Sequence, residues 1–304
     1  MRTFTFKSLF LTVLFMLLGS TAILAADDGL ITRQVTLKLD EAGTLPNMIS
    51  YDQKNLITNM KIVGKINGTD LKFIREMAGR DVNGGKTDGK LSILDLSEAK
   101  IVAGGDAYVR FSENYYTSND KLGDYAFSGC SGLTSLTLPS SVTSIGNQAF
   151  YDCSGLTSLT IPSGVTSIGN YAFYGCSGLT SLIIPSGVTS IGKWAFRGCS
   201  GLTSIYVYPE NLPELGIDIF NGCDAKNCTV YVPKGTYDAY KSSEFGYFEK
   251  IVEFDASGID KVTTSTNAKE VSRYAANGQR LSAPAKGLNI VKYSDGSVKK
   301  VVVQ

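Results

Sequence analysis

Residues 133–155 read LTSLTLPSSVTSIGNQAFYDCSG, and residues 156–178 and 179–201 repeat this phrase almost unchanged. Matching phenylalanines lie 23 residues apart, and each is followed three positions later by a cysteine. The phenylalanines are Phe127, Phe150, Phe173 and Phe196, and Phe220 continues the series after a spacing of 24. A period of about 20 to 50 residues indicates a solenoid, in which each repeat forms one coil that stacks on the next.

The apolar positions of each repeat predict which side chains enter the core. Leu133, Leu136 and Leu138 follow L-x-x-L-x-L, which places the last two on one face of a short strand. Pro139 ends that strand because proline has no N–H for a further ladder. The turn after Gly146 then brings an aromatic ring to the centre of the coil. One coil cannot bury enough apolar surface to fold alone, so the array is predicted to fold cooperatively.

This strand pattern, followed by I-G-x-x-A-F-x-x-C, resembles the 23-residue leucine-rich repeats of the BspA-like surface proteins of Bacteroidetes and some other bacteria. The resemblance covers residues 121–235 and implies adhesion. The predicted fold class is a leucine-rich repeat solenoid, an α/β-type right-handed superhelix with a parallel sheet on one face, plus a small C-terminal antiparallel β unit. The cysteine stands three positions before the next leucine, so the usual argument for an asparagine ladder does not carry over to this array.

Five segments are predicted along the chain. They are a signal peptide (1–26), an N-terminal cap with irregular leucine-rich repeats (27–120), the regular 23-residue repeats with a C-terminal cap (121–254), a linker (255–268) and a C-terminal β domain (269–304). The signal peptide is inferred from Arg2 and Lys7, the apolar run that follows them and the small residues after it. A retained membrane anchor is the alternative, and no later segment is apolar and long enough to span a bilayer.

The segments on either side of the array carry weaker signals. In the N-terminal part, residues 35–39 predict a capping strand, and Leu71, Ile74 and Met77 predict a helix whose N-cap is Thr69 or Asp70. At the other end, the turn signals near Asn277-Gly278 predict antiparallel strands. This last stretch, with NGQRL, KGLNIV and KKVVV, resembles the C-terminal β domains of secreted Bacteroidetes proteins, some of which serve as type IX sorting signals.

The six cysteines invite a disulfide interpretation, because an exported chain with an even number commonly forms bridges. Their periodicity favours a buried ladder of thiols, since equivalent residues in stacked coils point in parallel directions instead of toward one another. Cys228 breaks the period, so a bridge from it to Cys223 stays open. Zinc is disfavoured because a ladder spreads its ligands along an axis.

Composition excludes several classes of function. The 29 Lys and Arg balance the 28 Asp and Glu, so no basic surface drives nucleic-acid binding. The chain has no histidine, which removes Ser-His-Asp and Cys-His catalysis and the commonest metal ligand. We therefore expect no enzyme activity, no cofactor and no metal. A glycosidase with paired carboxylates is the remaining enzymatic hypothesis, but Asp124 and Asp152 are too isolated to be nominated.

Binding positions should be those that vary between copies while the frame stays fixed. Seven such positions are the ligand-binding candidates: Tyr151, Tyr171, Tyr174, Ile183, Trp194, Arg197 and Tyr206. Rows of aromatic rings suit sugars or extended protein partners. The structural alternative is that tyrosine and tryptophan simply fit strands and turns and pack on their neighbours. The favoured hypothesis is a secreted or cell-surface, adhesin-like protein that binds a host or bacterial surface protein, or a glycan. A structural component of the bacterial envelope is the alternative.

Overall fold

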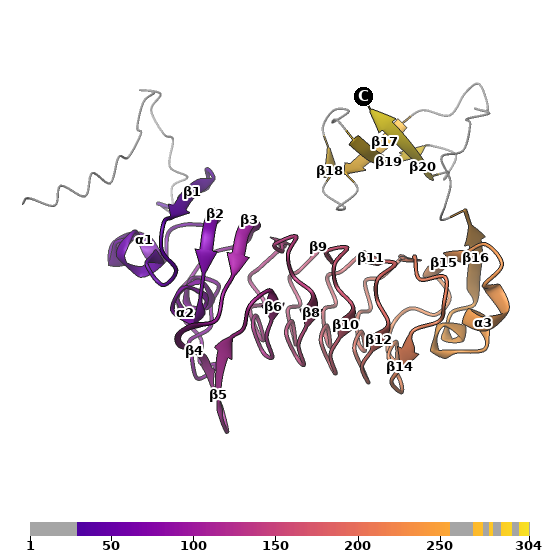
Figure 1. Ribbon diagram of the computed structural model, residues 1–304, viewed down its shortest axis with the longest axis horizontal. Coiled ribbons are helices and arrows are strands. Elements are labelled where there is room, and N and C mark those ends of the chain that lie inside the picture. Colours follow the sequence, from indigo (N-terminus) through magenta and orange to yellow (C-terminus); the bar gives the residue numbers. More distant parts are fainter. Residues whose placement is uncertain (1–28, 256–269, 276–279, 282–286, 294–297, 304) are drawn as a thin grey trace, which may run out of the picture.

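The computed structural model describes residues 29–255, 270–275, 280–281, 287–293 and 298–303. The expected signal peptide (1–26) and all of the expected linker except residue 255 lie outside these residues. Residues 122–215 form a row of similar coils that runs between an N-terminal part with helix α2 (Gly68–Met77) and a C-terminal part with helix α3 (Tyr237–Lys241) (Figure 1). Among the described residues, no helix is long and apolar enough to cross a membrane.

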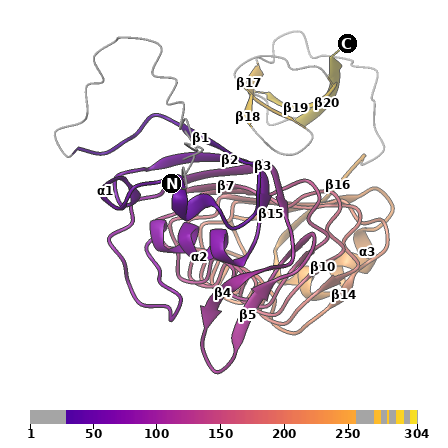
Figure 2. The same ribbon diagram turned by 60° about the vertical axis from the view of Figure 1, so that its left-hand side comes forward.

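One face of the solenoid carries parallel strands contributed by successive coils (Figures 1 and 2). The strands are β1 (Val35–Leu39), β2 (Asn59–Ile66), β3 (Ile93–Ile101), β7 (Ser135–Thr137), β9 (Ser158–Thr160), β11 (Ser181–Ile184), β13 (Ser204–Val207), β15 (Thr229–Pro233) and β16 (Lys250–Phe254). Equivalent residues pair in register, for example Leu136 with Leu159. The leucines of the L-x-x-L-x-L pattern point inward as predicted, and β1 covers the first edge.

The strands of that face form two sheets, β1-β2-β3-β7-β9 and β11-β13-β15-β16. A separate parallel sheet, which the sequence analysis did not anticipate and which we call the second sheet, lies on a second side of the same coils. Its strands are β6 (Lys121–Leu122), β8 (Ser144–Ile145), β10 (Ser167–Ile168), β12 (Ser190–Ile191) and β14 (Glu214–Leu215). Directly after these strands an asparagine ladder joins neighbouring coils. The backbone N–H of Asn170 donates to Asn147 Oδ1 at 2.8 Å, and the N–H of Lys193 donates to Asn170 Oδ1 at 2.9 Å. The array thus has an asparagine ladder, although its cysteine does not stand at the position from which the usual ladder argument starts.

Two ladders of buried side chains fill the core of the array. The rings of the periodic phenylalanines are stacked, with centroids 5.0 Å apart between Phe150 and Phe173 and 5.1 Å apart between Phe173 and Phe196. The periodic cysteines are free and buried, as predicted, and Cys176 Sγ donates to Phe150 O at 3.1 Å. Cys223 and Cys228 are also free, so no bridge joins them. Each coil thus adds one ring, one thiol and one S–H···O bond to a continuous core.

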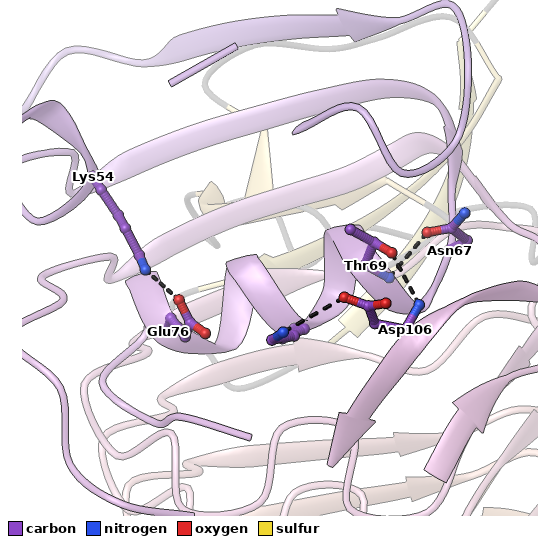
Figure 3. A network of polar contacts seen from close by, with 6 residues as sticks. Lys54, Asn67, Thr69, Glu76 and Asp106 are labelled. Carbon is purple, nitrogen blue, oxygen red and sulfur yellow. Dashed lines mark hydrogen bonds and ion pairs between the residues drawn. The ribbon is translucent and has the colours of Figure 1, made fainter. Parts of the chain in front are cut away.

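Helix α2 packs in the N-terminal part against the strands and the hairpin of β4 (Gly104–Arg110) and β5 (Asn114–Thr117). Its N-cap is Asn67, not the expected Thr69 or Asp70: the Asn67 side chain accepts from the N–H of Thr69, and the Asp70 carboxylate accepts from the N–H of Asn67. Polar contacts tie the helix to its surroundings, including the Lys54–Glu76 ion pair and the bond from the N–H of Asp106 to the Thr69 hydroxyl (Figure 3). The short helices η1 (Leu45–Asn47) and α1 (Tyr51–Lys54) precede it.

Arg75 and Tyr108 satisfy the open end of the first regular coil. In later coils the backbone carbonyls at these positions accept from the preceding coil, as Ala149 O does from the N–H of Phe127 at 2.7 Å. The first coil has no such predecessor. Arg75 Nη1 instead donates to Ala126 O at 3.0 Å, and the Tyr108 hydroxyl donates to Asp124 O at 2.8 Å. Arg75 is fully buried, so water cannot bond to these carbonyls in its place. The two side chains therefore supply the hydrogen bonds that a preceding coil would supply.

The C-terminal end of the array is covered by aromatic side chains. Rings of α3 and of η2 (Glu244–Tyr247) pack beyond the last phenylalanine of the ladder, with Phe245 5.0 Å from Phe220. Glu244 accepts from the backbone N–H of Ile219 at 3.3 Å. After β16, the strands β17 (Glu270–Ala275), β18 (Arg280–Leu281), β19 (Gly287–Tyr293) and β20 (Val298–Val303) form the expected antiparallel unit, in the order β18-β17-β19-β20.

Candidate functional site: an aromatic ridge along the coils

One position of each regular coil has a left-handed backbone conformation without being glycine. The residues there, with φ between 53° and 59°, are Tyr125, Gln148, Tyr171, Trp194 and Asp218. Left-handed backbone costs an L-residue with a bulky side chain about 1–2 kcal/mol, and glycine or asparagine would relieve the cost. Large side chains at these positions therefore oppose local stability. Such strain commonly marks residues kept for what they present to a partner.

Five of the seven sequence-predicted candidates meet at this position and the one three residues later. Tyr151 and Tyr174 are stacked, with ring centroids 4.9 Å apart and planes within 3° of each other. Tyr171 lies 4.7 Å from Trp194, which also contacts the Arg197 guanidinium at 5.9 Å. All five side chains are half-buried because the rings cover one another, which supports the structural alternative in part. We call these five, with Tyr125 and Lys193, the aromatic ridge.

The β4–β5 hairpin lengthens the ridge beyond the regular array. The Phe111 ring lies 5.0 Å from the ring of Tyr125, and the Tyr115 ring lies 4.9 Å from it. Phe111 is 46% exposed and Tyr116 is 54% exposed, so this end is more open than the stacked rings of the coils. Sequence analysis missed the hairpin residues because they fall outside the 23-residue period. The only available signal was the aromatic density of the FSENYY stretch (111–116).

The remaining two candidates, Ile183 and Tyr206, lie on the strand face and pair with each other across β11 and β13. Tyr206 stacks on Tyr231 with a centroid distance of 4.5 Å. Burial raises the pKa of Tyr206 to about 12, and the neighbouring tyrosine hydroxyls, among them that of Tyr274 in β17, add to the effect. Figures 1 and 2 show the C-terminal sheet on the side of this strand face. The candidates therefore form two separate groups, of which the ridge is the longer.

A shallow groove of about 480 Å³ runs along the second sheet beside the ridge. Successive coils line it with the same positions, Ser-Ile-Gly-Asn, and Glu214 to Gly216 line its last part. The glycines are required there, because a Cβ on Gly169 or Gly192 would collide with the backbone of the preceding coil. Asn147 and Asn170 line the groove, and the next residue along the chain is in each case a ridge position. We call this feature the second-sheet groove.

Two of the carboxylates near the ridge, those of Asp124 and Asp218, are engaged in structural contacts, whereas Asp152 beside Tyr151 is exposed. Asp124 Oδ1 accepts from the N–H of Asn147 at 2.7 Å, so it begins the asparagine ladder. Asp218 Oδ2 accepts from Trp194 Nε1 at 3.4 Å. Within the residues that the structure describes, no three His, Cys, Asp or Glu gather closely enough to hold a metal ion. Cationic side chains lie close to the rings of the ridge: Lys193 Nζ lies 5.2 Å from the Trp194 ring.

Parts of the chain are similar to known proteins. Three solved structures are similar to parts of the chain: a leucine-rich repeat protein of T. pallidum, one from Bacteroides ovatus, and a leucine-rich cell surface protein from Faecalibacterium prausnitzii. Their respective identities are 26%, 22% and 20%, and the TM-scores are 0.37, 0.38 and 0.25. The matches cover 48%, 66% and 66% of this chain, and 70%, 49% and 51% of the other proteins.

None of the curated proteins compared with this chain matches it. A family model does: the BspA type leucine rich repeat region matches in six copies. The matching segment, residues 120–244, includes all the regular coils together with part of the C-terminal cap. The repeat array is therefore what this chain shares with that family.

Proposed function

We propose that this chain is an adhesin-like binding protein, exported to the cell surface or beyond, that recognises a surface protein or a glycan through the aromatic ridge. The observation that carries the proposal is the occupation of left-handed positions by Tyr125, Tyr171 and Trp194. A scaffold selected for stability alone would place glycine or asparagine there. The rings supply apolar area, and Lys193 and Arg197 add charge for orientation.

The domain organisation belongs to the same proposal. In it, residues 1–26 direct export, residues 27–120 and the C-terminal cap close the ends of the solenoid, and the array displays the binding surface. Residues 269–304 form an accessory unit of the kind that serves as a sorting signal. The structure supports the display role, since successive coils repeat one frame in register and vary at the ridge.

The test measures binding of the full chain to immobilised extracellular-matrix proteins and to a glycan array. Trp194→Ala and Tyr171→Ala each remove one ridge ring, and Tyr237→Ala serves as the matched control because its ring is 40% exposed on α3. We expect saturable binding that both ridge variants weaken at least tenfold and the control leaves unchanged. Melting curves of all three variants show that the fold is retained.

Two outcomes contradict the proposal. Binding that persists in both ridge variants would move the site to the strand face around Tyr206. Absence of binding to every immobilised partner, together with self-association in light scattering, would support a structural role in the bacterial envelope instead.

A further inference from the structure

We propose that the aromatic ridge and the second-sheet groove together bind one extended, β-1,4-linked polysaccharide chain that crosses the coils, with one sugar unit for each coil. This inference rests on the proposed function, because it assigns a ligand class to the same surface. Two features indicate a ligand: the polar second-sheet groove, and the row of aromatic rings beside it.

The spacing of the coils favours a sugar chain. Ser144, Ser167 and Ser190 are paired in register across β8, β10 and β12. Neighbouring strands of a sheet lie about 4.8 Å apart, so a ligand that crosses the strands meets the same serine at that interval. One pyranose unit with equatorial 1,4 linkages advances its chain by nearly the same length, and because successive units are turned over, the two hydroxyl-bearing edges of the ribbon meet the serines in alternation. An extended peptide advances about 3.3 Å per residue, so neither one residue nor two residues match this interval, and the peptide would lose register after one coil.

The polar groups of the groove are available to a ligand. Among the described residues, the hydroxyls of Ser144, Ser167 and Ser190 have no hydrogen-bond partner in the protein. Asn170 uses its Oδ1 atom for the ladder, and within the described part of the chain its Nδ2 group donates to no protein atom. Three coils thus offer a hydroxyl, one of them adds an amide donor, and the fourth offers the Glu214 carboxylate at the equivalent position. These groups suit the equatorial hydroxyls along the edge of a sugar ribbon.

Lys193 connects the groove with the ridge. Its backbone N–H donates to Asn170 Oδ1 in the groove at 2.9 Å, whereas its Nζ atom lies 5.2 Å from the Trp194 ring and 5.9 Å from the Tyr171 ring. The rings therefore stand directly beside the polar channel. A flat sugar chain presents apolar C–H faces and polar edges, so one ligand uses both surfaces at once.

The experiment titrates the full chain with β-1,4-linked oligomers of glucose, N-acetylglucosamine, mannose and xylose, each two to six units long, by calorimetry. The groove spans β8, β10, β12 and β14, so we expect at least one series to bind with an affinity that rises up to about four units and then levels. Ser167→Phe fills the middle of the groove and should weaken binding at least tenfold. The matched control, Ser158→Phe, places the same ring on the strand face of the same coil.

Three results would overturn this inference: no series binds, affinity is independent of chain length, or Ser167→Phe binds as tightly as the parent chain. These failures are distinguishable from failure of the proposed function. In one outcome, matrix proteins bind, Trp194→Ala weakens that binding, and no sugar oligomer binds. The ridge is then a protein-binding surface, and only the polysaccharide assignment is wrong.

Discussion

Six ion pairs lie in the N-terminal part, at or before Asp120, whereas among the described residues the regular coils that follow (121–215) contain none. The difference follows from repetition. Stacking places equivalent side chains about 4.8 Å apart, where two like charges repel by roughly 1 kcal/mol in water and about 3 kcal/mol at a lower effective dielectric. The frame of the array therefore uses groups that pair with copies of themselves, namely Phe, Cys, Thr and Asn. The irregular coils, free of the period, pair opposite charges.

Alkaline pH should give the largest difference between the two regions, because all six cysteines lie after residue 121. Burial raises the pKa of the thiols of Cys153, Cys176 and Cys199 well above 9. In the unfolded chain these thiols release their protons near pH 9, so the unfolded state is favoured as the pH rises further. Each thiol should cost about 1.4 kcal/mol of stability per pH unit above 9, and the ladder several kcal/mol together.

The measurement is the free energy of unfolding between pH 8 and pH 10.5 under reducing conditions, with hydrogen exchange to locate the opening. Cys176→Ala should lower the slope by about 1.4 kcal/mol per pH unit, because one thiol is missing. Exchange should open the coils before helix α2. An unchanged slope in Cys176→Ala would show that the thiols do not control alkaline unfolding.

Removal of the arginine that caps the array should be the next largest effect. Arg75→Met keeps the length of the side chain but leaves the buried carbonyl of Ala126 without its donor. Hydrogen bonds to charged groups contribute about 1.5–3 kcal/mol each, so we expect a loss of about 2–4 kcal/mol in denaturant unfolding. Lys72→Met, which removes a half-buried ion-pair partner on the same helix, is the control and should cost under about 1 kcal/mol. Equal losses would mean that the guanidinium is not a cap.

The salt dependence of stability should also differ between the irregular and the regular coils, although the changes in unfolding free energy are smaller. Lys61→Ala removes contacts to Asp95 and Glu98, and should cost about 0.5–1 kcal/mol at low salt and less at 1 M NaCl. Thr189→Val removes a hydroxyl that donates to Thr166 O at 3.1 Å in the array. Its cost should be similar in size but independent of salt. Urea titrations at both salt concentrations test this, and a salt-sensitive Thr189→Val would contradict the distinction.

The smallest effect concerns the left-handed positions of the array. Gln148→Gly relieves the backbone cost at φ 53° and removes one hydrogen bond to the Tyr125 hydroxyl. The net change should be near zero or a gain of up to about 1 kcal/mol. Gln148→Ala keeps the strain and loses the bond, so it should be less stable than Gln148→Gly. The reverse order of stability in thermal unfolding would contradict the argument that the left-handed backbone of the ridge positions is strained.

The period of the sequence was sufficient to predict the parts of the fold that every coil repeats. Phe150, Cys153 and Leu136 are buried as expected, since their spacing leaves no other face for them. The second sheet escaped prediction because Ser144–Ile145 is too short to show alternation. Asn147 and Asn170 were not singled out from the sequence, although their side chains accept from the next coil.

Outside the period, local signals were ambiguous. The sequence Asn67-Gly-Thr-Asp contains three residues able to cap a helix, and only the folded backbone shows that Asn67 is the cap and Asp70 its reciprocal partner. The same limit applies to the candidate site. The period identified Tyr171 and Trp194 as displayed positions, but the contact of Phe111 with Tyr125 joins residues from different kinds of coil and has no sequence signature.

The donors that Arg75 and Tyr108 supply end on backbone carbonyls and on no side chain of the first coil. A backbone carbonyl is the same in every copy, so these donors do not depend on later copies, while the packing of Phe111 and Tyr115 on Tyr125 fits the first copy in particular. Units of 23 residues could then be inserted or removed further along the array without any change to this end. The number of coils, and with it the length of the displayed surface, is therefore open to rapid evolutionary change, while the terminal pieces stay constant.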